Sequence, residues 1–228
     1  MPSSTDPHHA GPLAGADREV TERERELLEA ALRVLEDVGY DRLTMDAVAL
    51  AARASKATLY RRWNGKLPMV IDALACQKSP GIVPDTGSLR GDLIASFCMP
   101  GGLADRHSVA SLASVLTAIT RDPEFAAAFR REVVGPKSAA GRLIYERARD
   151  RGEIREDVDL DLLGPALAGI VLHRHFVLGE VPDEASIGRV VDQIILPAVL
   201  PGASDAVPPR DSDAPSRPSE PQDKDHSS

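Results

Sequence analysis

Residues 55–63 read "SKATLYRRW", a short stretch that combines a helix-capping residue with cations and large aromatic side chains. Ser55 directly precedes the run, and a serine in this position accepts a hydrogen bond from the first turn of a helix. The cations are Lys56, Arg61 and Arg62, and the aromatic residues are Tyr60 and Trp63. The stretch predicts a short capped helix with a basic face, inside a chain whose formal net charge is −8.

The positive charge is confined to the region around this helix. Between Asp41 and Lys66 the chain has six basic and two acidic residues, a local charge of +4 that leaves −12 for the remainder. An acidic protein repels nucleic acid at long range, but the counterion release that drives phosphate binding needs only local Lys and Arg residues. The patch predicts contact with DNA phosphates, and a solvated helix face is the alternative interpretation.

The flanking residues extend this helix to a helix-turn-helix arrangement. A longer helix is expected from about Thr21 to Gly39, and Thr44 is the expected N-cap of a second, short helix. Arg53 and Ala54 then make a turn before Ser55. A recognition helix enters the major groove with its N-terminal residues toward the base edges.

The expected DNA contacts follow from this placement. Base edges should meet the first turn of the recognition helix, which holds Lys56, Ala57 and Thr58. Phosphates or purine edges should meet the next turn, with Tyr60, Arg61 and Arg62. Two further residues, Thr44 and Lys66, begin the flanking helices, where the helix dipole favours a phosphate.

The stretch "LTMDAVALAARASKATLYRRWNGKLPMV" at residues 43–70 resembles the DNA-binding region of tetracycline-repressor-type (TetR) transcriptional regulators. The segment "LLEAALRVLEDVGYDR" before it is similar to the first helix of that family, so the resemblance covers about residues 22–75. It implies an all-α homodimer whose DNA-binding head is followed by a helical domain that binds a small effector. It also implies that DNA is touched by Thr44, Lys56, Thr58, Tyr60, Arg61 and Lys66, and that Trp63 packs in the core of the head.

The turn departs from the pattern of the family. The family usually has Ala-Gly-Val-Ser, whereas residues 52–55 here are Ala-Arg-Ala-Ser. A residue other than glycine with positive φ costs about 1 kcal/mol. We therefore expect either a strained Arg53 or a slightly different turn, and Arg53 and Ser55 join the expected DNA-binding set.

The domain organisation follows from composition and helical periodicity. Residues 1–18 and 201–228 are rich in Pro, Ser and Asp or Gly and are expected to be disordered tails. Residues 19–66 are the expected helix-turn-helix domain, and 67–200 the expected ligand-binding and dimerisation domain, with a connecting helix at 67–78. Within it we expect helices at 88–99, 105–120, 122–151 with a pause at Gly135-Pro136, 160–178 and 184–199. The last two, being broadly apolar, should pair with those of a second copy.

Other classes of function find little support in the sequence. It contains no Walker-type phosphate loop, GxGxxG, GxSxG or HExxH motif, so neither an enzyme nor a cofactor is expected. Cys76 and Cys98 are expected to be small buried residues in a reducing cytoplasm, and no apolar run is long enough for a membrane span. No metal site is expected: His8 and His9 lie in the N-terminal tail, and the Asp157–Asp161 segment lacks the glycine and glutamate of a calcium loop.

The effector site is expected between residues 88 and 180, because the head is too small to hold both a core and a ligand cavity. Ser114, Thr117 and His173 are its polar candidates. Close helix packing for the two hydroxyls and a structural histidine are the alternative interpretations. The expected function is a repressor that binds a palindromic double-stranded operator as a homodimer and is released by an unknown small molecule. A helical DNA-binding or adaptor protein without an effector is the alternative.

Overall fold

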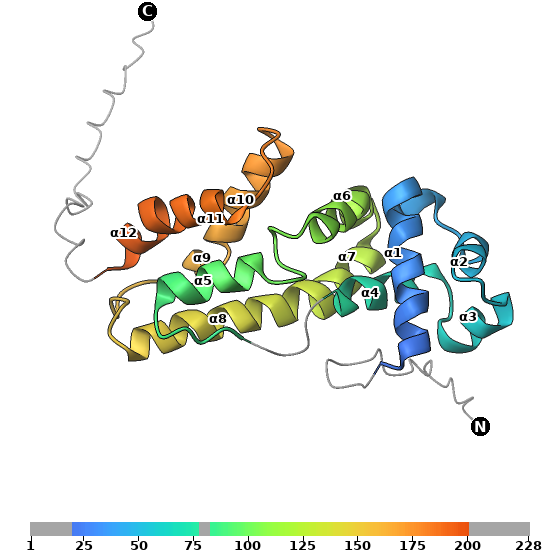
Figure 1. Ribbon diagram of the computed structural model, residues 1–228, viewed down its shortest axis with the longest axis horizontal. Helices are drawn as coiled ribbons and strands as arrows, with labels where there is room; N and C mark the ends of the chain where they lie inside the picture. The colour runs from blue at the N-terminus through green and yellow to red at the C-terminus, as the bar shows by residue number, and fades with distance from the viewer. Residues whose placement is uncertain (1–19, 78–82, 201–228) are drawn as a thin grey trace, which may run out of the picture.

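The computed structural model describes residues 20–77 and 83–200, and within these ranges every regular element is helical. The head is formed by the first helices: α1 (Glu22–Arg42), α2 (Met45–Ala51) and α3 (Lys56–Arg62), with α4 (Lys66–Cys76) leading away from it. The order of two short helices behind a long one confirms the predicted helix-turn-helix arrangement. Figure 1 shows this head at one end of an elongated molecule.

The rest of the chain forms a second group of helices. It comprises α5 (Leu89–Cys98), α6 (Arg106–Arg121), α7 (Pro123–Phe129), the π-helical turn η1 (Arg130–Val134), α8 (Gly135–Asp150), α9 (Leu160–Leu163), α10 (Ala166–Phe176), α11 (Glu184–Val190), the π-helical turn η2 (Val191–Ile195) and α12 (Leu196–Val199). The long helix α8 continues from α7 and runs along α5 (Figure 1). The all-α fold class is confirmed.

Most helices begin at a residue whose side chain accepts a hydrogen bond from the first turn, which satisfies one of the otherwise unpaired N–H groups there. These N-caps are Thr21, Thr44, Ser55, Ser88, Asp105, Asp122, Asp159 and Asp183. Asp159, which belongs to the acidic segment Asp157–Asp161, is therefore the N-cap of α9. The cap of α3 is Ser55, as the opening stretch predicts.

Two hydrophobic clusters hold the helices together. The first joins the head, including Leu35, Leu59 and Trp63, to α4 and to residues of α6, α7 and η1 such as Phe125. The second lies among α5, α8 and the C-terminal helices, and includes Leu93 and Leu167. The first cluster thus extends beyond residue 66, so α6 and α7 pack with the head rather than with the C-terminal helices. The domain boundaries themselves stay a prediction, and the predicted tails lie outside the described residues.

Helix boundaries differ from the predicted ones at prolines. The helix does not pause at Gly135-Pro136 as predicted. Instead, the π-helical turn η1 lies directly before Gly135, where α8 begins. A second π-helical turn, η2, likewise ends two residues before Pro197. Since proline has no N–H to offer the preceding turn, a local change from α to π hydrogen bonding accommodates it. The predicted helix at 160–178 was also wrong in one respect, because Gly164-Pro165 separates α9 from α10.

The C-terminal helices bury most of their apolar face within the chain. The second cluster includes Leu167, Val171, Ile187 and Ile195, so less apolar surface is left for a partner than the sequence predicts. The apolar residues that remain exposed include Leu162, Val177, Leu178, Val181 and Ile194. The cysteines also differ from expectation, because Cys76 is exposed and Cys98 is only half-buried.

Candidate DNA-binding interface

The turn between α2 and α3 places the recognition helix on the surface. Arg53 has a φ of 47°, and in the described ranges it is the only residue other than glycine with positive φ. Arg53 therefore has a backbone conformation that glycine adopts more readily, at a conformational cost of about 1 kcal/mol. The first of the two predicted outcomes for this turn is confirmed: the geometry is kept, and Arg53 is strained.

The predicted contact residues gather on the exposed side of the head. Thr44, Arg53, Ser55, Lys56, Ala57, Tyr60, Arg61 and Arg62 are exposed, and Thr58 and Lys66 are half-buried. Tyr60 in particular is 55% exposed, which is unusual for a large aromatic side chain. Among the residues that the structure describes, neither Arg53 nor Arg61 forms an ion pair, so both guanidinium groups are available to phosphates.

The first turn of the recognition helix is held by short polar contacts. The Ser55 hydroxyl accepts from the Thr58 backbone N–H at 3.1 Å and lies 2.8 Å from the Thr58 hydroxyl. Lys56 Nζ donates to Asp46 Oδ2 on α2 at 2.6 Å. Both partners of this pair are more than half exposed, and such a pair contributes at most about 1 kcal/mol. Lys56 can therefore exchange Asp46 for a base edge at small cost.

Arg62 is held differently from Arg61. Its Nε and Nη2 both donate to Glu24 Oε1 on α1, at 3.0 and 2.9 Å. The Glu24 side chain is only 11% exposed, and a two-bond contact with a shielded carboxylate fixes the guanidinium more firmly than a surface pair does. Arg62 thus ties the end of the recognition helix to α1.

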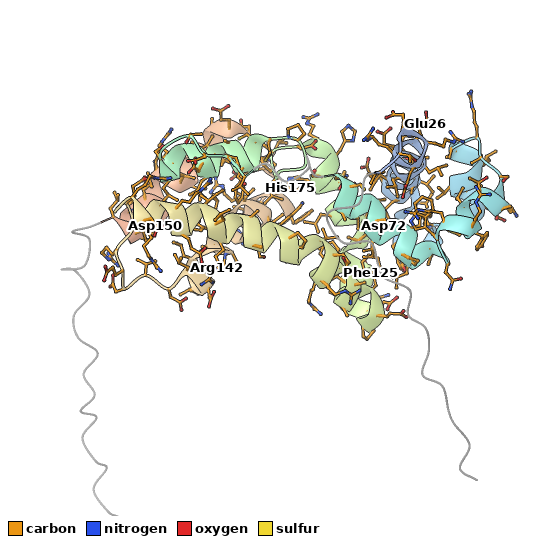
Figure 2. All side chains as sticks on the ribbon, turned by 90° about the horizontal axis from the view of Figure 1, so that it is seen from below. Glu26, Asp72, Phe125, Arg142, Asp150 and His175 are labelled. Atoms are coloured by element: carbon orange, nitrogen blue, oxygen red, sulfur yellow. The ribbon has the colours of Figure 1, made fainter. Side chains whose placement is uncertain are left out.

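Two contacts fix the start of α4 against the head. Lys66 Nζ donates to the Tyr40 carbonyl at 3.0 Å and lies 4.4 Å from the centroid of the Tyr40 ring. Trp63 is 2% exposed and its Nε1 donates to Asp72 Oδ2 on α4 at 2.8 Å. The predicted core role of Trp63 is confirmed. In Figure 2, Asp72 and Phe125 lie where the head meets the rest of the chain.

The Tyr40 ring links the head to α7. Its centroid lies 4.4 Å from that of Phe125, and Phe125 in turn stacks on Phe129. Burial, with the nearby carboxylates of Asp122, Glu124 and Asp41, raises the pKa of Tyr40 to about 12. The phenol therefore stays neutral, and Lys66 meets the ring and the backbone rather than a phenolate.

Three residues of the interface were missed from the sequence. Glu24 and Asp46 are the acidic partners just described, and Arg23 Nη2 donates to the Ala52 carbonyl at 3.3 Å, where α2 ends. The Arg23 and Glu24 contacts span 29 and 38 residues of sequence. No local pattern points to them, because they depend on how α1 crosses the helix-turn-helix.

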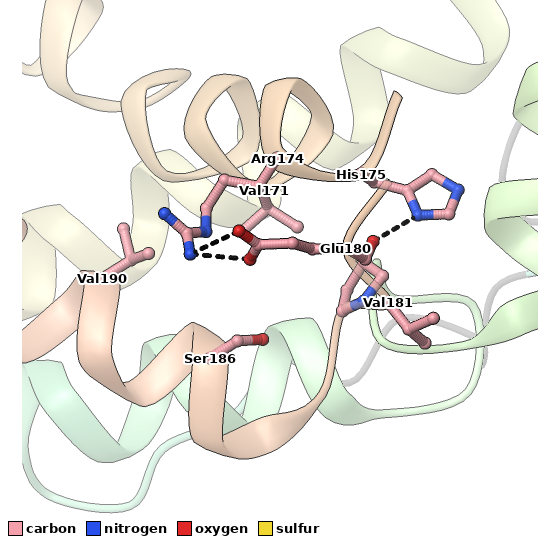
Figure 3. A pocket seen from close by; sticks show the side chains of 8 residues that line it. Val171, Arg174, His175, Glu180, Val181, Ser186 and Val190 are labelled. Carbon is pink, nitrogen blue, oxygen red and sulfur yellow. Dashed lines mark hydrogen bonds and ion pairs between the residues drawn. The ribbon is translucent and has the colours of Figure 1, made fainter. Parts of the chain in front are cut away.

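The predicted effector residues do not share one site in the structure. Ser114 is half-buried on α6 and donates to the Ala110 carbonyl at 2.9 Å, while Thr117 on α6 and His173 on α10 are exposed. A hollow of about 10 Å³ between α10 and α11, with room for about one water molecule, is lined instead by residues such as Val171, Ser186 and Val190. Figure 3 shows the Arg174–Glu180 ion pair within it. Ligand pockets usually measure about 300–1,000 Å³, so this hollow is small for an effector.

Neither a metal centre nor a membrane span emerges from residues 20–77 and 83–200. No group of three or more His, Cys, Asp or Glu side chains there is arranged to hold a metal ion. No helix in this part of the chain is both long and apolar enough to cross a bilayer. His8 and His9, which were considered as ligands, lie outside the described residues.

Comparisons with known proteins agree with the geometry of the head. Residues 27–72 match the family model "Bacterial regulatory proteins, tetR family", and residues 83–194 match "Tetracyclin repressor-like, C-terminal domain". A protein of Mycobacteroides abscessus named "DNA-binding transcriptional repressor TetR" is 38% identical over 183 residues, which cover 79% of this chain and 96% of that protein. An uncharacterised HTH-type transcriptional regulator of Mycobacterium tuberculosis is 36% identical over 178 residues, covering 78% and 88%.

A solved structure extends the comparison to three dimensions. The crystal structure of the TetR family transcription regulator SCO0332 aligns with a TM-score of 0.59 and 30% identity, and covers 79% of this chain and 100% of that one. The predicted family is confirmed. The family consists of transcriptional regulators rather than enzymes. The chain belongs to the TetR family and is a helix-turn-helix, DNA-binding transcriptional regulator.

Proposed function

We propose that the protein is a repressor that binds a palindromic operator as a homodimer and leaves it when a small molecule binds. The observation that carries the proposal is the exposed recognition helix, whose basic residues stand on an otherwise acidic chain. The name of the M. abscessus relative, a transcriptional repressor, supports the direction of control. Because the chromosome is the binding partner, we expect the protein to act in the cytoplasm.

The exposed residues of the head divide into three roles in this proposal. Base edges are contacted by Lys56, Ala57 and Thr58 at the start of α3. Phosphates are contacted by Thr44, Arg53, Ser55, Tyr60, Arg61 and Lys66, which surround that helix. Arg62 keeps a place in the set as a positioning residue, because Glu24 already holds its guanidinium.

The dimer is proposed to form through the C-terminal helices. Ile194 is 48% exposed and Leu162 is 75% exposed, on helices that otherwise bury their apolar residues. Gly169 adds a small exposed residue on α10, and small residues allow two helices to approach closely. Two-fold pairing of these helices would bury the exposed Ile194 and Leu162 side chains and place two heads side by side on DNA.

Release from DNA is proposed to follow from linkage between two binding sites. An effector that prefers a dimer with the wrong spacing between its heads must weaken operator binding by the same factor. Ser114, Thr117 and His173 were the polar candidates for that site. They lie on helices that pack against different neighbours, α6 against α1 and α7 and α10 against α9, α11 and η2.

Selection of bound duplexes from random DNA tests this function. The expected result is one enriched sequence made of two inverted half-sites, spaced by about one helical turn of 10 base pairs. Enrichment of a single half-site would contradict the dimer, and no enrichment above background would contradict sequence-specific binding. Measuring operator affinity with and without candidate effectors then separates a ligand-released repressor from a DNA-binding protein that has no effector.

A further inference from the structure

One face of α8 carries polar groups that the DNA-binding function leaves unexplained. Lys137, Gly141 and Tyr145 follow one another at intervals of four residues on this helix, and residues so spaced lie along one side. With a rise of about 1.5 Å per residue, Lys137 and Tyr145 are about 12 Å apart along the axis. We call these three residues the α8 face.

Tyr145 brings a buried hydroxyl to this face. The residue is 1% exposed and belongs to the second hydrophobic cluster, together with Leu89, Leu93 and Ile144. Its hydroxyl has no hydrogen-bond partner in the part of the chain that the structure describes. Burial raises the pKa of Tyr145 to about 12, so the group stays a protonated donor. Buried tyrosine hydroxyls are usually paired, and an oxygen atom of a ligand would pair this one.

Lys137 brings a cation to the other end. Its ammonium makes one hydrogen bond, to the Gly101 carbonyl at 3.3 Å, in the turn between α5 and α6. Burial lowers the pKa of Lys137, and the Asp105 carboxylate opposes that effect only in part. In the part of the chain that the structure describes, the ammonium makes no second hydrogen bond, which leaves two of its N–H donors for an anion. A carboxylate there would offset the desolvation of the charge.

Gly141 leaves room between the two polar groups. The residue is half-buried, yet a Cβ atom added to it would meet no atom within 4 Å. A Cβ at Gly102, in the turn that Lys137 contacts, would instead collide with the Phe97 backbone. The open space at Gly141 thus contrasts with the close packing at Gly102.

We propose that the α8 face binds the effector, and that the effector is a hydrophobic carboxylic acid with a second oxygen atom at its far end. The carboxylate pairs with Lys137, the distal hydroxyl or carbonyl oxygen accepts from the Tyr145 hydroxyl, and the apolar body covers Gly141. This inference rests on the proposed function, because it gives the small molecule of that function a site and a chemical class.

The turn that Lys137 contacts connects this face to the head. Leu103 in the turn packs on the second cluster, and Asp105 at its end caps α6. On α6, Ser111 donates to Glu36 of α1 at 2.8 Å. A carboxylate that draws Lys137 away from Gly101 therefore acts on a turn that leads directly to the contact between α6 and the head.

Calorimetric titration of the full chain with three matched probes tests the proposal. The probes are 10-hydroxydecanoate, decanoate and decan-1-ol, whose ten-carbon chain is about as long as the axial separation of Lys137 and Tyr145 on α8. We expect 10-hydroxydecanoate to bind most tightly. Tyr145→Phe should weaken its binding about tenfold, or about 1.4 kcal/mol, and leave decanoate unchanged. Lys137→Met should weaken both acids and leave decan-1-ol unchanged.

A matched pair of leucine substitutions controls for general effects on α8. Gly141→Leu should fill the space and abolish binding of all three probes, whereas Ser138→Leu, at an exposed position of the same helix, should leave it intact. Without a probe, Tyr145→Phe should unfold at the same temperature or higher, because no hydrogen bond is lost. A fall in that temperature would reveal a partner for the hydroxyl and overturn the proposal.

The remaining outcomes separate this proposal from the proposed function. Failure of all three probes to bind at millimolar concentration, or equal binding to the Gly141→Leu and Ser138→Leu variants, would show that the α8 face is not this site. Regulation by some other molecule would be untouched by that result. Probe binding with the expected pattern but with unchanged operator affinity would keep the site and remove its role as the effector site.

Discussion

The head and α8 differ in whether their buried polar groups have hydrogen-bond partners. In the head, Trp63 donates to Asp72 and Arg62 to Glu24, so buried or shielded polar groups have partners and the groups left over are on the surface. On α8 the buried Tyr145 hydroxyl has no partner among the residues that the structure describes. A surface that recognises DNA needs rigidly held side chains. A site that responds to a ligand needs polar groups whose hydrogen-bond partner is supplied only by the ligand.

Removal of the central aromatic residue of the head should have the largest effect on stability. Trp63 is 2% exposed within the first cluster, so Trp63→Ala loses packing and leaves a cavity. We expect the free energy of unfolding to fall by about 3–5 kcal/mol, measured by urea denaturation, with loss of operator binding.

A pair of milder substitutions sharpens the comparison between the two regions. Trp63→Phe keeps most of the ring but loses the hydrogen bond to Asp72, at an expected cost of about 1 kcal/mol. Tyr145→Phe removes a hydroxyl that has no partner within residues 20–77 and 83–200, and it should cost nothing. Equal losses in the two variants would show that the polar groups of the two regions are satisfied alike.

The sequence predicted the head better than the rest because its signals are local. Thr44, Ser55 and Asp122 were recognisable as N-caps since a cap bonds only two or three residues ahead. A strained Arg53 was one of the two outcomes predicted from a single position in the turn. The Arg62–Glu24 contact joins residues 38 apart, and the isolation of the Tyr145 hydroxyl depends on every neighbouring helix. Such features follow from tertiary packing, which periodicity and spacing do not reveal.

The candidate effector residues failed to converge for the same reason. Ser114, Thr117 and His173 were chosen as polar residues on expected apolar helices, with no information on which sides of those helices meet. In the structure α6 packs on α1 and α7, whereas α10 packs on α9, α11 and η2. Residue type alone therefore did not distinguish a shared wall from two separate surfaces.

Dimerisation should depend on the C-terminal helices and not on the head. Ile194→Asp would place a charge in the proposed interface, and an unpaired charge there is expected to cost about 3 kcal/mol or more. Light scattering should then show a monomer, and operator affinity should fall because one head binds one half-site. Leu116→Asp is the control, since Leu116 is 40% exposed on α6, away from the C-terminal helices. A dimer that survives Ile194→Asp would contradict the proposed interface.

Within the head, the start and the end of the recognition helix should behave differently. Lys56→Ala or Thr58→Ala should change the preferred base at one position of each half-site by about 1–3 kcal/mol. Arg61→Ala should weaken binding to all sequences alike and reduce the salt dependence by about one counterion. Titrations of operator variants at several salt concentrations distinguish the two effects. Uniform loss of affinity in every variant would mean that the start of α3 does not meet base edges.

The smallest effect is expected where the two regions meet. Ser111 is fully buried, accepts from Gln77 Nε2 on the C-terminal side of α4 at 2.9 Å and donates to Glu36 Oε1 on α1 at 2.8 Å. Ser111→Ala leaves both partners without this contact, but each is only partly buried, so water can replace it and the loss of stability should be about 1 kcal/mol.

The Ser111→Ala substitution should affect regulation more clearly than it affects stability. Because the serine joins the head to α6, Ser111→Ala should lower the coupling free energy between effector and operator by about 0.5–2 kcal/mol, with each affinity nearly unchanged when the other ligand is absent. Coupling is the ratio of operator affinities with and without a saturating effector. Ser108→Ala is the matched control, since Ser108 is also buried on α6 but bonds Asp105 within the same segment. If both alanine variants keep full coupling, the head and the C-terminal helices communicate by another route, and the contact at Ser111 serves only to pack them together.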